Sequence, residues 1–179
     1  MHYVNIYSFI GTRQPGSFAE YICVPEQNAV PFDDSVSFEQ GALFEPAAVA
    51  LHGLECLPYE GGKTVAILGG GTIGLLVMQW ANIYGAAKTV VFDIDDDRIK
   101  LAKEMGAYDG VNTLEEGFME KAMAMTDGKG FDYIYETAGS TITMKMAYEL
   151  AANKSRYLLY WKTNQRVNIH SRRMGEHEP

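Results

Sequence analysis

The hydrophobic and polar positions between residues 64 and 152 follow two alternating patterns, which predict strands and helices in turn. Short apolar runs predict strands buried on both faces, and these runs span residues 64–68, 89–93, 110–112 and 131–136. Longer segments predict helices over residues 73–84, 97–105, 114–126 and 141–152. This alternation predicts an α/β fold, a parallel sheet with helices on both faces.

Small and acidic residues mark the ends of the first two helices. Gly85 and Gly106 stand where glycine commonly ends a helix, and Asp95 or Asp96 can cap the second helix with a carboxylate. The first helix is apolar on nearly every side, which predicts that it is buried.

The region before residue 64 carries weaker patterns. Residues 18–25 indicate a short strand stopped by proline, and residues 37–54 indicate helical segments. Ser37 can cap the first of these helices, and Pro46 suits the opening turn of the second. His52 lies among apolar residues in the second helix, so a core side chain is expected there.

A glycine-rich turn joins the first strand to the first helix. Gly69, Gly71 and Gly74 form G-x-G-x-x-G, a weak pattern alone, but here it follows a strand and opens a helix in a strand–helix–strand unit. Gly69 permits the tight turn, Gly71 leaves room for a pyrophosphate, and Gly74 lets the helix pack closely on the strand. Free N–H groups around Thr72 and Ile73 would face the phosphates, so the pattern predicts a Rossmann-type dinucleotide site.

An acidic residue stands where such a site needs one. Asp93 ends the second strand, 19 residues after Gly74, and its carboxylate can accept hydrogen bonds from a ribose while repelling a 2′-phosphate. This arrangement favours NAD over NADP. A glycine turn followed by an acidic residue is also compatible with FAD and other nucleotides. Asp93 is also compatible with a simpler role, that of a polar turn residue after a strand.

Composition narrows the class of protein. Of 179 residues, 47% are hydrophobic, which is enough to bury a core. No apolar stretch reaches membrane-spanning length and no basic-then-apolar leader opens the chain, so we expect a cytoplasmic protein without a membrane partner. The net charge of −8 argues against a nucleic-acid partner. Cys23 and Cys56 are too few for a disulfide framework and lack metal-knuckle spacing, so buried thiols are expected.

Five segments together resemble the zinc-dependent medium-chain dehydrogenase family, most closely its polyol and polyol-phosphate dehydrogenases. They are YSFIGTRQPGSFAEY, FEPAAVALHG, GGGTIGLL, VVFDIDDDRIKLAKEMGA and FDYIYETAGS, and the resemblance covers residues 7–155. It implies NAD-dependent oxidation of a secondary alcohol, with a zinc ion that polarises the alcohol oxygen. It also implies that residues 1–47 are a remnant of a GroES-like catalytic lobe and that residues 48–155 are an incomplete NAD-binding domain.

The resemblance also implies roles for individual residues. Those expected to contact the cofactor are Gly69, Gly71, Thr72, Ile73, Gly74, Asp93 and Arg98. Among these, Asp93 binds the adenosine ribose and Arg98 lies by the adenine. Glu45 matches a glutamate in or beside the family's zinc shell, although a carboxylate near a helix N-terminus is also favourable for electrostatic reasons alone.

The zinc ligands implied by the resemblance are mostly missing. A catalytic zinc needs about three protein ligands and an open position, but the family's cysteine and His-Glu pair have no counterpart in this chain. The last of the family's four structural-zinc cysteines would fall near Val4. We therefore expect no complete catalytic site here, with zinc and the polyol belonging to the intact enzyme. The alternatives are a non-catalytic NAD-binding module and an inert fragment.

Residues 156–179 differ from the rest of the chain. They contain five basic and two acidic residues, whereas residues 1–155 contain 10 basic and 21 acidic residues. A basic tail can be a functional arm. However, its codons read one base later allow ICFIGK and then WENMN, which resemble the family's next segments, so residues 157–179 are interpreted as a frameshifted tail. The alternative is a genuine divergent strand, because RYLLYW is apolar enough to fill the same place.

An incomplete sheet exposes apolar surface, so a homo-oligomer is expected.

Overall fold

The computed structural model describes residues 10–11 and 14–160, and the chain forms two compact units, Met1–Gly41 and Ala42–Pro179. The organisation predicted from the sequence puts its first boundary at residue 47 and its second at residue 155. That three-part division stays a prediction, because most of the tail lies outside the described residues.

The described part of the first unit holds little regular structure. It contains a 3-10 helix, η1 (Glu26–Asn28), and one turn of α-helix, α1 (Phe38–Gly41). Ser37 lies at the start of α1 as predicted. The Gln40 N–H donates to Ser37 Oγ (3.2 Å), and the Ser37 N–H donates to Gln40 Oε1 (2.9 Å). This reciprocal pair is a capping box.

The strand predicted over residues 18–25 is wrong. These residues are exposed and adopt bends and irregular backbone. A strand must satisfy its backbone hydrogen bonds with a neighbouring strand, and no described segment pairs with residues 18–25.

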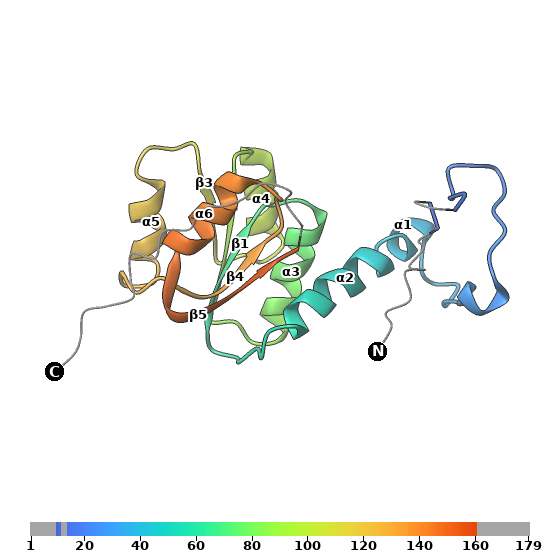
Figure 1. Cartoon of the computed structure of the whole chain (residues 1–179), viewed down its shortest axis with the longest axis horizontal. Helices are drawn as coiled ribbons and strands as arrows, with labels where there is room; N and C mark the ends of the chain where they lie inside the picture. The colour runs from blue at the N-terminus through green and yellow to red at the C-terminus, as the bar shows by residue number, and fades with distance from the viewer. Residues whose placement is uncertain (1–9, 12–13, 161–179) are drawn as a thin grey trace, which may run out of the picture. The chain divides into compact units, whose positions relative to one another are not determined.

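The second unit is built around one parallel sheet (Figure 1), with strands in the order β3-β2-β1-β4-β5. The strands are β1 (Thr64–Leu68), β2 (Lys88–Asp93), β3 (Asp109–Asn112), β4 (Phe131–Glu136) and β5 (Ala151–Leu159). The helices are α2 (Phe44–Glu55), α3 (Thr72–Ile83), α4 (Asp96–Glu104), α5 (Phe118–Ala124) and α6 (Thr141–Glu149). The predicted α/β fold is confirmed.

Two hydrophobic clusters cover the two faces of the sheet. Alternate residues of each strand point to opposite faces, so Val65 and Ile67 of β1 join one cluster while Ala66 and Leu68 join the other. The first cluster includes side chains of α2, α3 and α4, and the second includes side chains of α5 and α6. Because both faces are covered, the central strands β1 and β2 carry the continuous apolar runs that the sequence predicted. The edge strand β5 instead contains polar and exposed residues.

The predicted ends of the first two helices are confirmed, whereas the helix predicted over residues 114–126 is shorter and spans Phe118–Ala124. Asp95 is the cap of α4, and its side chain accepts hydrogen bonds from the N–H groups of Asp97 and Arg98. Gly85 and Gly106 follow α3 and α4 with positive φ angles of 82° and 102°, which favour glycine. The burial predicted for the whole of α3 is only partly right, because Ile83 in its last turn is 70% exposed.

The last strand begins earlier than predicted. The helix expected to reach residue 152 ends at Glu149, and β5 starts at Ala151. Phe131 of β4 pairs with Ala151, but Tyr133 pairs with Arg156, so β5 bulges between these two pairs. The strand continues to Leu159, and the first residues of the atypical tail therefore do occupy the sheet position. The frameshift hypothesis concerns the coding sequence and stays a prediction.

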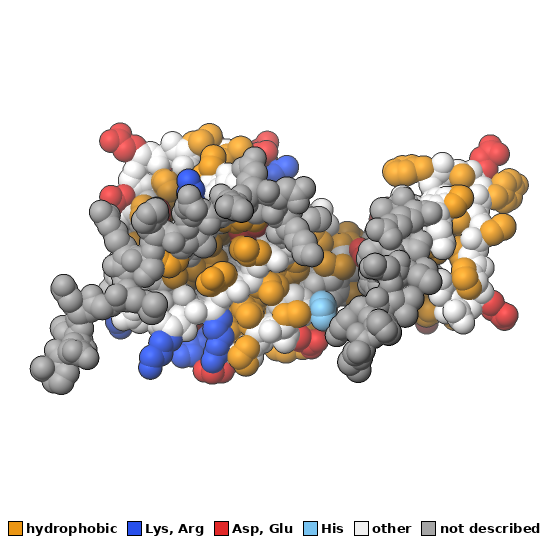
Figure 2. Space-filling model, viewed as in Figure 1, with side chains coloured by type: hydrophobic (Ala, Val, Ile, Leu, Met, Phe, Trp, Pro, Cys, Tyr) orange, Lys and Arg blue, Asp and Glu red, His pale blue; other side chains and the backbone are white. Residues whose placement is uncertain are grey.

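Apolar side chains also reach the surface of the described residues (Figure 2), including Tyr157 at 54% and Leu159 at 43% exposed. The homo-oligomer expected from such exposure stays a prediction. None of the helices in the described part of the chain has the length and hydrophobicity of a membrane-spanning segment.

Candidate functional site

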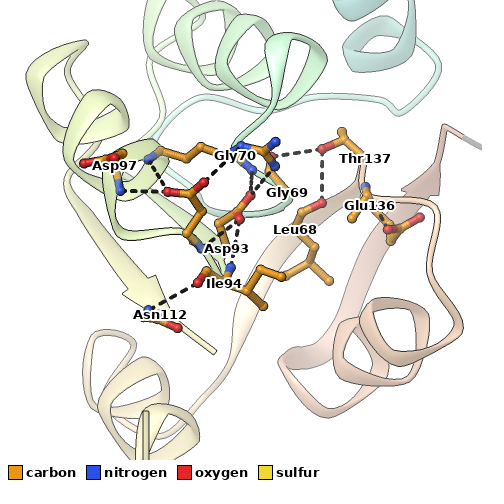
Figure 3. Close-up of polar contacts among 12 residues, drawn as sticks. Leu68, Gly69, Gly70, Asp93, Ile94, Asp97, Asn112, Glu136 and Thr137 are labelled. Carbon is orange, nitrogen blue, oxygen red and sulfur yellow. Dashed lines mark hydrogen bonds and ion pairs between the residues drawn. The ribbon is translucent and has the colours of Figure 1, made fainter. Parts of the chain in front are cut away.

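The glycine turn lies where the chain changes direction across the sheet. From β1 the chain forms β2 and β3 on one side, and it then crosses to form β4 and β5 on the other. Ligands of open parallel sheets bind outside the carboxyl ends of the strands at such a point. Residues 69–71 follow β1 there, and Thr137 follows β4 beside them (Figure 3).

The three glycines of the pattern meet different physical requirements. Gly69 has a φ of +111°, a conformation that side chains disfavour. A Cβ on Gly74 would collide with the Gly69 carbonyl oxygen, so only glycine lets α3 start this close to the turn. A Cβ on Gly71 would have no atom within 4 Å, so the backbone at this position faces open space. These are the local features that a pyrophosphate-binding turn requires.

The N-terminus of α3 lies at this open position. Gly71 is its N-cap residue and provides no side-chain hydrogen bond to the first turn. The first N–H groups of a helix have no acceptor within the helix, and the helix dipole adds partial positive charge. Thr72 is exposed and Ile73 is half-buried at this end. This helix end is therefore suited to an anion.

Asp93, at the end of β2, stabilises the glycine turn through hydrogen bonds. Only 8% of the residue is exposed. Its Oδ2 accepts a hydrogen bond from the Gly70 N–H (2.6 Å), and its Oδ1 accepts from the N–H groups of Ile94 (2.8 Å) and Asp95 (3.1 Å). Asp93 therefore has the simpler of the two roles expected from the sequence, that of a polar residue in the turn after a strand. The ribose contact implied by the resemblance stays a prediction.

Arg98 lies on the same side of the site. Its guanidinium group is 3.6 Å from Asp93 Oδ2 and 3.9 Å from Asp95 Oδ2, and its side chain is 55% exposed. Gly70, which was not predicted from the sequence to be part of the site, lies in the turn beside Asp93 and Arg98. A Cβ on Gly70 would come within 3.3 Å of both Arg98 Cβ and Asp93 Oδ2. The three consecutive glycines at residues 69–71 are the sequence feature that could have indicated this close packing.

The loop after β4 also contacts the glycine turn, although the sequence did not predict this contact. The Thr137 hydroxyl lies 3.0 Å from the Leu68 carbonyl oxygen and 3.1 Å from the Gly69 carbonyl oxygen. Glu136, fully buried at the end of β4, holds this loop through its side chain. The segment FDYIYETAGS contributed to the family resemblance, but it did not predict this contact, because Thr137 is 68 residues away from Gly69 in the sequence.

The described residues do not fit a zinc ion. They contain no group of three or more His, Cys, Asp or Glu side chains that could hold a metal. Glu45 is exposed in the first turn of α2, and so it meets the electrostatic preference of a helix N-terminus. Its metal role stays a prediction, and Val4 lies outside the described residues.

Two expectations about residues outside the cofactor site were wrong. His52 is exposed, not a core side chain, because it lies on the part of α2 that no described segment covers. Cys23 and Cys56 are exposed thiols rather than buried ones. Cys56 Sγ lies 3.7 Å from His52 Nε2, one helical turn apart. Apolar neighbours along a helix predict burial only where another element packs against that face.

The comparisons with known proteins agree with this architecture. The galactitol 1-phosphate 5-dehydrogenase of Escherichia coli (strain K12) is 34% identical over 170 residues, which cover 95% of this chain and 49% of the relative. The sorbitol dehydrogenase of Bacillus subtilis (strain 168) is 33% identical over 132 residues, which cover 74% of this chain and 37% of the relative. The chain thus spans half or less of the length of these relatives.

Two solved structures in the comparison hold a dinucleotide. One is a zinc-binding dehydrogenase from Sinorhizobium meliloti 1021 bound to NADP, with a TM-score of 0.80 and 31% identity over 90% of this chain and 48% of that one. The other is an alcohol dehydrogenase from E. coli CFT073 complexed with NADH, with a TM-score of 0.82 and 26% identity over 91% of this chain and 48% of that one.

The family assignment rests on the model of zinc-binding dehydrogenases, which matches residues 72–171. This match begins at the first residue of α3, just after the glycine turn, and runs through strands β2 to β5 into the tail. It covers more than half of the chain, and the polyol dehydrogenases above are among its relatives. The chain therefore belongs to the zinc-binding dehydrogenase family, a family of oxidoreductases.

Proposed function

We propose that the second unit binds a nicotinamide dinucleotide at the glycine turn, as the cofactor half of a polyol or polyol-phosphate dehydrogenase. The proposal rests on one arrangement at the carboxyl edge of the sheet. There the N-terminus of α3, which has no side-chain cap, meets the open position at Gly71 and the buried carboxylate of Asp93. In this arrangement the pyrophosphate binds at the start of α3, and the adenosine ribose binds beside Asp93. The residues proposed to bind the cofactor are Gly69, Gly71, Thr72, Ile73, Gly74, Asp93 and Arg98.

We propose NAD rather than NADP as the preferred cofactor. The Asp93 carboxylate lies at the end of β2, where a 2′-phosphate would approach, and Asp95, Asp96 and Asp97 follow after a single intervening residue. Four carboxylates close to one phosphate dianion disfavour it by repulsion. Arg98 offsets only part of this charge, because its guanidinium group already lies near Asp93 and Asp95. Since the two solved relatives carry NADP and NADH respectively, the preference needs a direct measurement.

The reaction proposed for the intact enzyme is the oxidation of a secondary alcohol to a ketone. A bound NAD accepts the hydride from the alcohol carbon. The part of this chain that the structure describes supplies the binding and orientation of that cofactor. Because these residues do not fit a zinc ion, we propose that this chain does not oxidise polyols by itself.

The test is a titration of the purified chain with NADH, followed by the change in NADH fluorescence. We expect a Kd in roughly the micromolar range, with NADPH and FAD at least tenfold weaker. Absence of NADH binding would favour the inert-fragment alternative. Zinc-dependent oxidation of sorbitol or galactitol 1-phosphate by the purified chain would contradict the proposed inactivity, and NADH binding without oxidation agrees with it.

A further inference from the structure

Glu136 is a buried acidic residue to which the sequence assigned no function. It ends β4 at the carboxyl edge of the sheet, and it is 0% exposed. Burying a carboxylate is unfavourable unless it is well hydrogen-bonded. A small apolar residue would complete the strand without this cost, so the contacts of Glu136 need an explanation.

One oxygen of Glu136 organises the loop that follows it. Oε1 accepts hydrogen bonds from the N–H groups of Ala138 (3.0 Å) and Gly139 (2.8 Å) and from the Thr143 hydroxyl (2.8 Å). The other oxygen, Oε2, is buried and has no hydrogen-bond partner among the described residues. All of the observed hydrogen bonding of this side chain is therefore directed at the loop after β4 and at the first turn of α6.

The loop held by Glu136 contacts the glycine turn directly. The Thr137 N–H donates to the Leu68 carbonyl oxygen (2.9 Å), and the Thr137 hydroxyl reaches the carbonyl oxygens of Leu68 (3.0 Å) and Gly69 (3.1 Å) (Figure 3). The packing is tight, because a Cβ on Gly69 would lie 2.9 Å from Thr137 Oγ1 and 3.0 Å from the Ala138 nitrogen. Thr137 and Ala138 thus form the wall of the turn that faces β4.

Asp93 and Glu136 hold the turn from its two sides. Asp93 accepts a hydrogen bond from the Gly70 N–H on the β2 side. On the β4 side, Thr137 contacts the Gly69 carbonyl oxygen, and Glu136 hydrogen-bonds the next two residues of the same loop, Ala138 and Gly139. A turn that is fixed before the ligand arrives loses less conformational entropy on binding. We propose that Glu136 is a positioning residue of the dinucleotide site, which holds the glycine turn in its pyrophosphate-binding conformation through Thr137. This inference rests on the proposed function, because it assumes that the turn binds a dinucleotide.

The test compares ligands that contain a pyrophosphate with one that does not. NADH and ADP-ribose contact the turn through the pyrophosphate, whereas AMP offers adenine, ribose and a single phosphate.

The variants are Glu136→Ala, Glu136→Gln, Thr137→Val and Val111→Ala. Glu136→Gln keeps an oxygen for the three donors and places its amide nitrogen where Oε2 accepts no hydrogen bond. Thr137→Val removes only the hydroxyl contact and leaves Glu136 in place. Val111→Ala truncates a fully buried side chain on β3, away from the loop.

For Glu136→Ala and Thr137→Val, we expect Kd for NADH and ADP-ribose to rise about tenfold, as loss of a buried hydrogen-bond network predicts. We expect Kd for AMP to change by less than about threefold, and Glu136→Gln to recover most of the pyrophosphate affinity. A role in folding alone predicts equal losses for all three ligands, in proportion to the loss of stability that Val111→Ala also shows. That outcome, or unchanged NADH affinity in Glu136→Ala, would overturn the inference while the parent chain still binds NADH. A parent chain that binds neither NADH nor ADP-ribose would instead overturn the proposed function and this inference with it.

Discussion

Tyr160 lies directly against the backbone of Gly53. Its hydroxyl donates a hydrogen bond to the Ala50 carbonyl oxygen (2.8 Å) on α2, and a Cβ on Gly53 would collide with the phenol ring. Two other aromatic side chains reach the same helix. The Trp80 indole N–H donates to the Ala47 carbonyl oxygen (3.0 Å), and the Tyr135 hydroxyl donates to the Leu54 carbonyl oxygen (3.4 Å). These contacts attach α2 to the sheet and α3.

Gly53→Ala should therefore destabilise the protein, although glycine to alanine normally stabilises a helix interior by about 1 kcal/mol. The added methyl overpacks the contact with Tyr160, which typically costs about 1–3 kcal/mol. Urea unfolding of the variant measures the difference. The double variant Gly53→Ala/Tyr160→Ala should be no less stable than Tyr160→Ala alone, because the ring that causes the collision is gone. Equal destabilisation in both backgrounds would show that the collision is not the cause.

Stability should fall at alkaline pH because three tyrosine hydroxyls are shielded from water. Burial raises the pKa of Tyr59 from 10.0 to about 12, with a smaller contribution from Tyr133, and burial also raises the pKa of Tyr135 and Tyr160. The folded state thus holds these protons more tightly than the unfolded state. The associated stability is fully present below the unfolded pKa near 10 and is lost as the pH rises toward and beyond 12.

Urea unfolding at about pH 9 and about pH 11 measures this loss, and absorbance at roughly 295 nm follows the phenolate. Tyr59→Phe removes one of the three groups and should show a shallower decline with pH. A decline of equal slope in Tyr59→Phe would mean that Tyr59 does not contribute.

Asp93→Asn should weaken NADH binding and reduce the preference over NADPH. Asparagine has one acceptor oxygen, whereas Asp93 uses two oxygens to accept from backbone N–H groups. The turn therefore loses a hydrogen bond to a charged group, worth about 1.5–3 kcal/mol or roughly 10- to 150-fold in Kd. Removing the charge also lessens repulsion of the 2′-phosphate. Asp97→Asn is the matched control, since it removes one exposed charge nearby. Similar shifts in the NADH to NADPH ratio for both variants would indicate a general effect of charge.

Lys154→Gly should stabilise the protein by about 1 kcal/mol, because a positive φ costs a non-glycine residue about 1–2 kcal/mol. Lys154 is exposed, lies in the bulge of β5 and has a φ of 65°. Thermal unfolding of Lys154→Gly and Lys154→Ala separates this effect from the loss of the ammonium group, since alanine keeps the strain. A gain in both variants would point to the side chain rather than the backbone.

The parts of the site that were predictable lie on adjacent stretches of chain. Gly69, Gly71 and Gly74 fall within one strand–turn–helix unit, and Asp93 ends the next strand, so spacing alone located them. Thr137 could not be located in this way. It reaches the Gly69 carbonyl only because β4 pairs with β1, and no pattern in the sequence states which strands are neighbours.

The sequence by itself determined strands β1 to β4, most of the helices and the ends of α3 and α4, because these depend on local periodicity and on single residues such as Asp95 and Gly85. Only the tertiary structure decided the exposure of His52, the irregular backbone at residues 18–25 and the hydrogen-bond partners of Glu136. Burial depends on which element covers a face, and strand pairing depends on a partner. The function of a buried carboxylate depends on donors that folding brings within hydrogen-bonding distance.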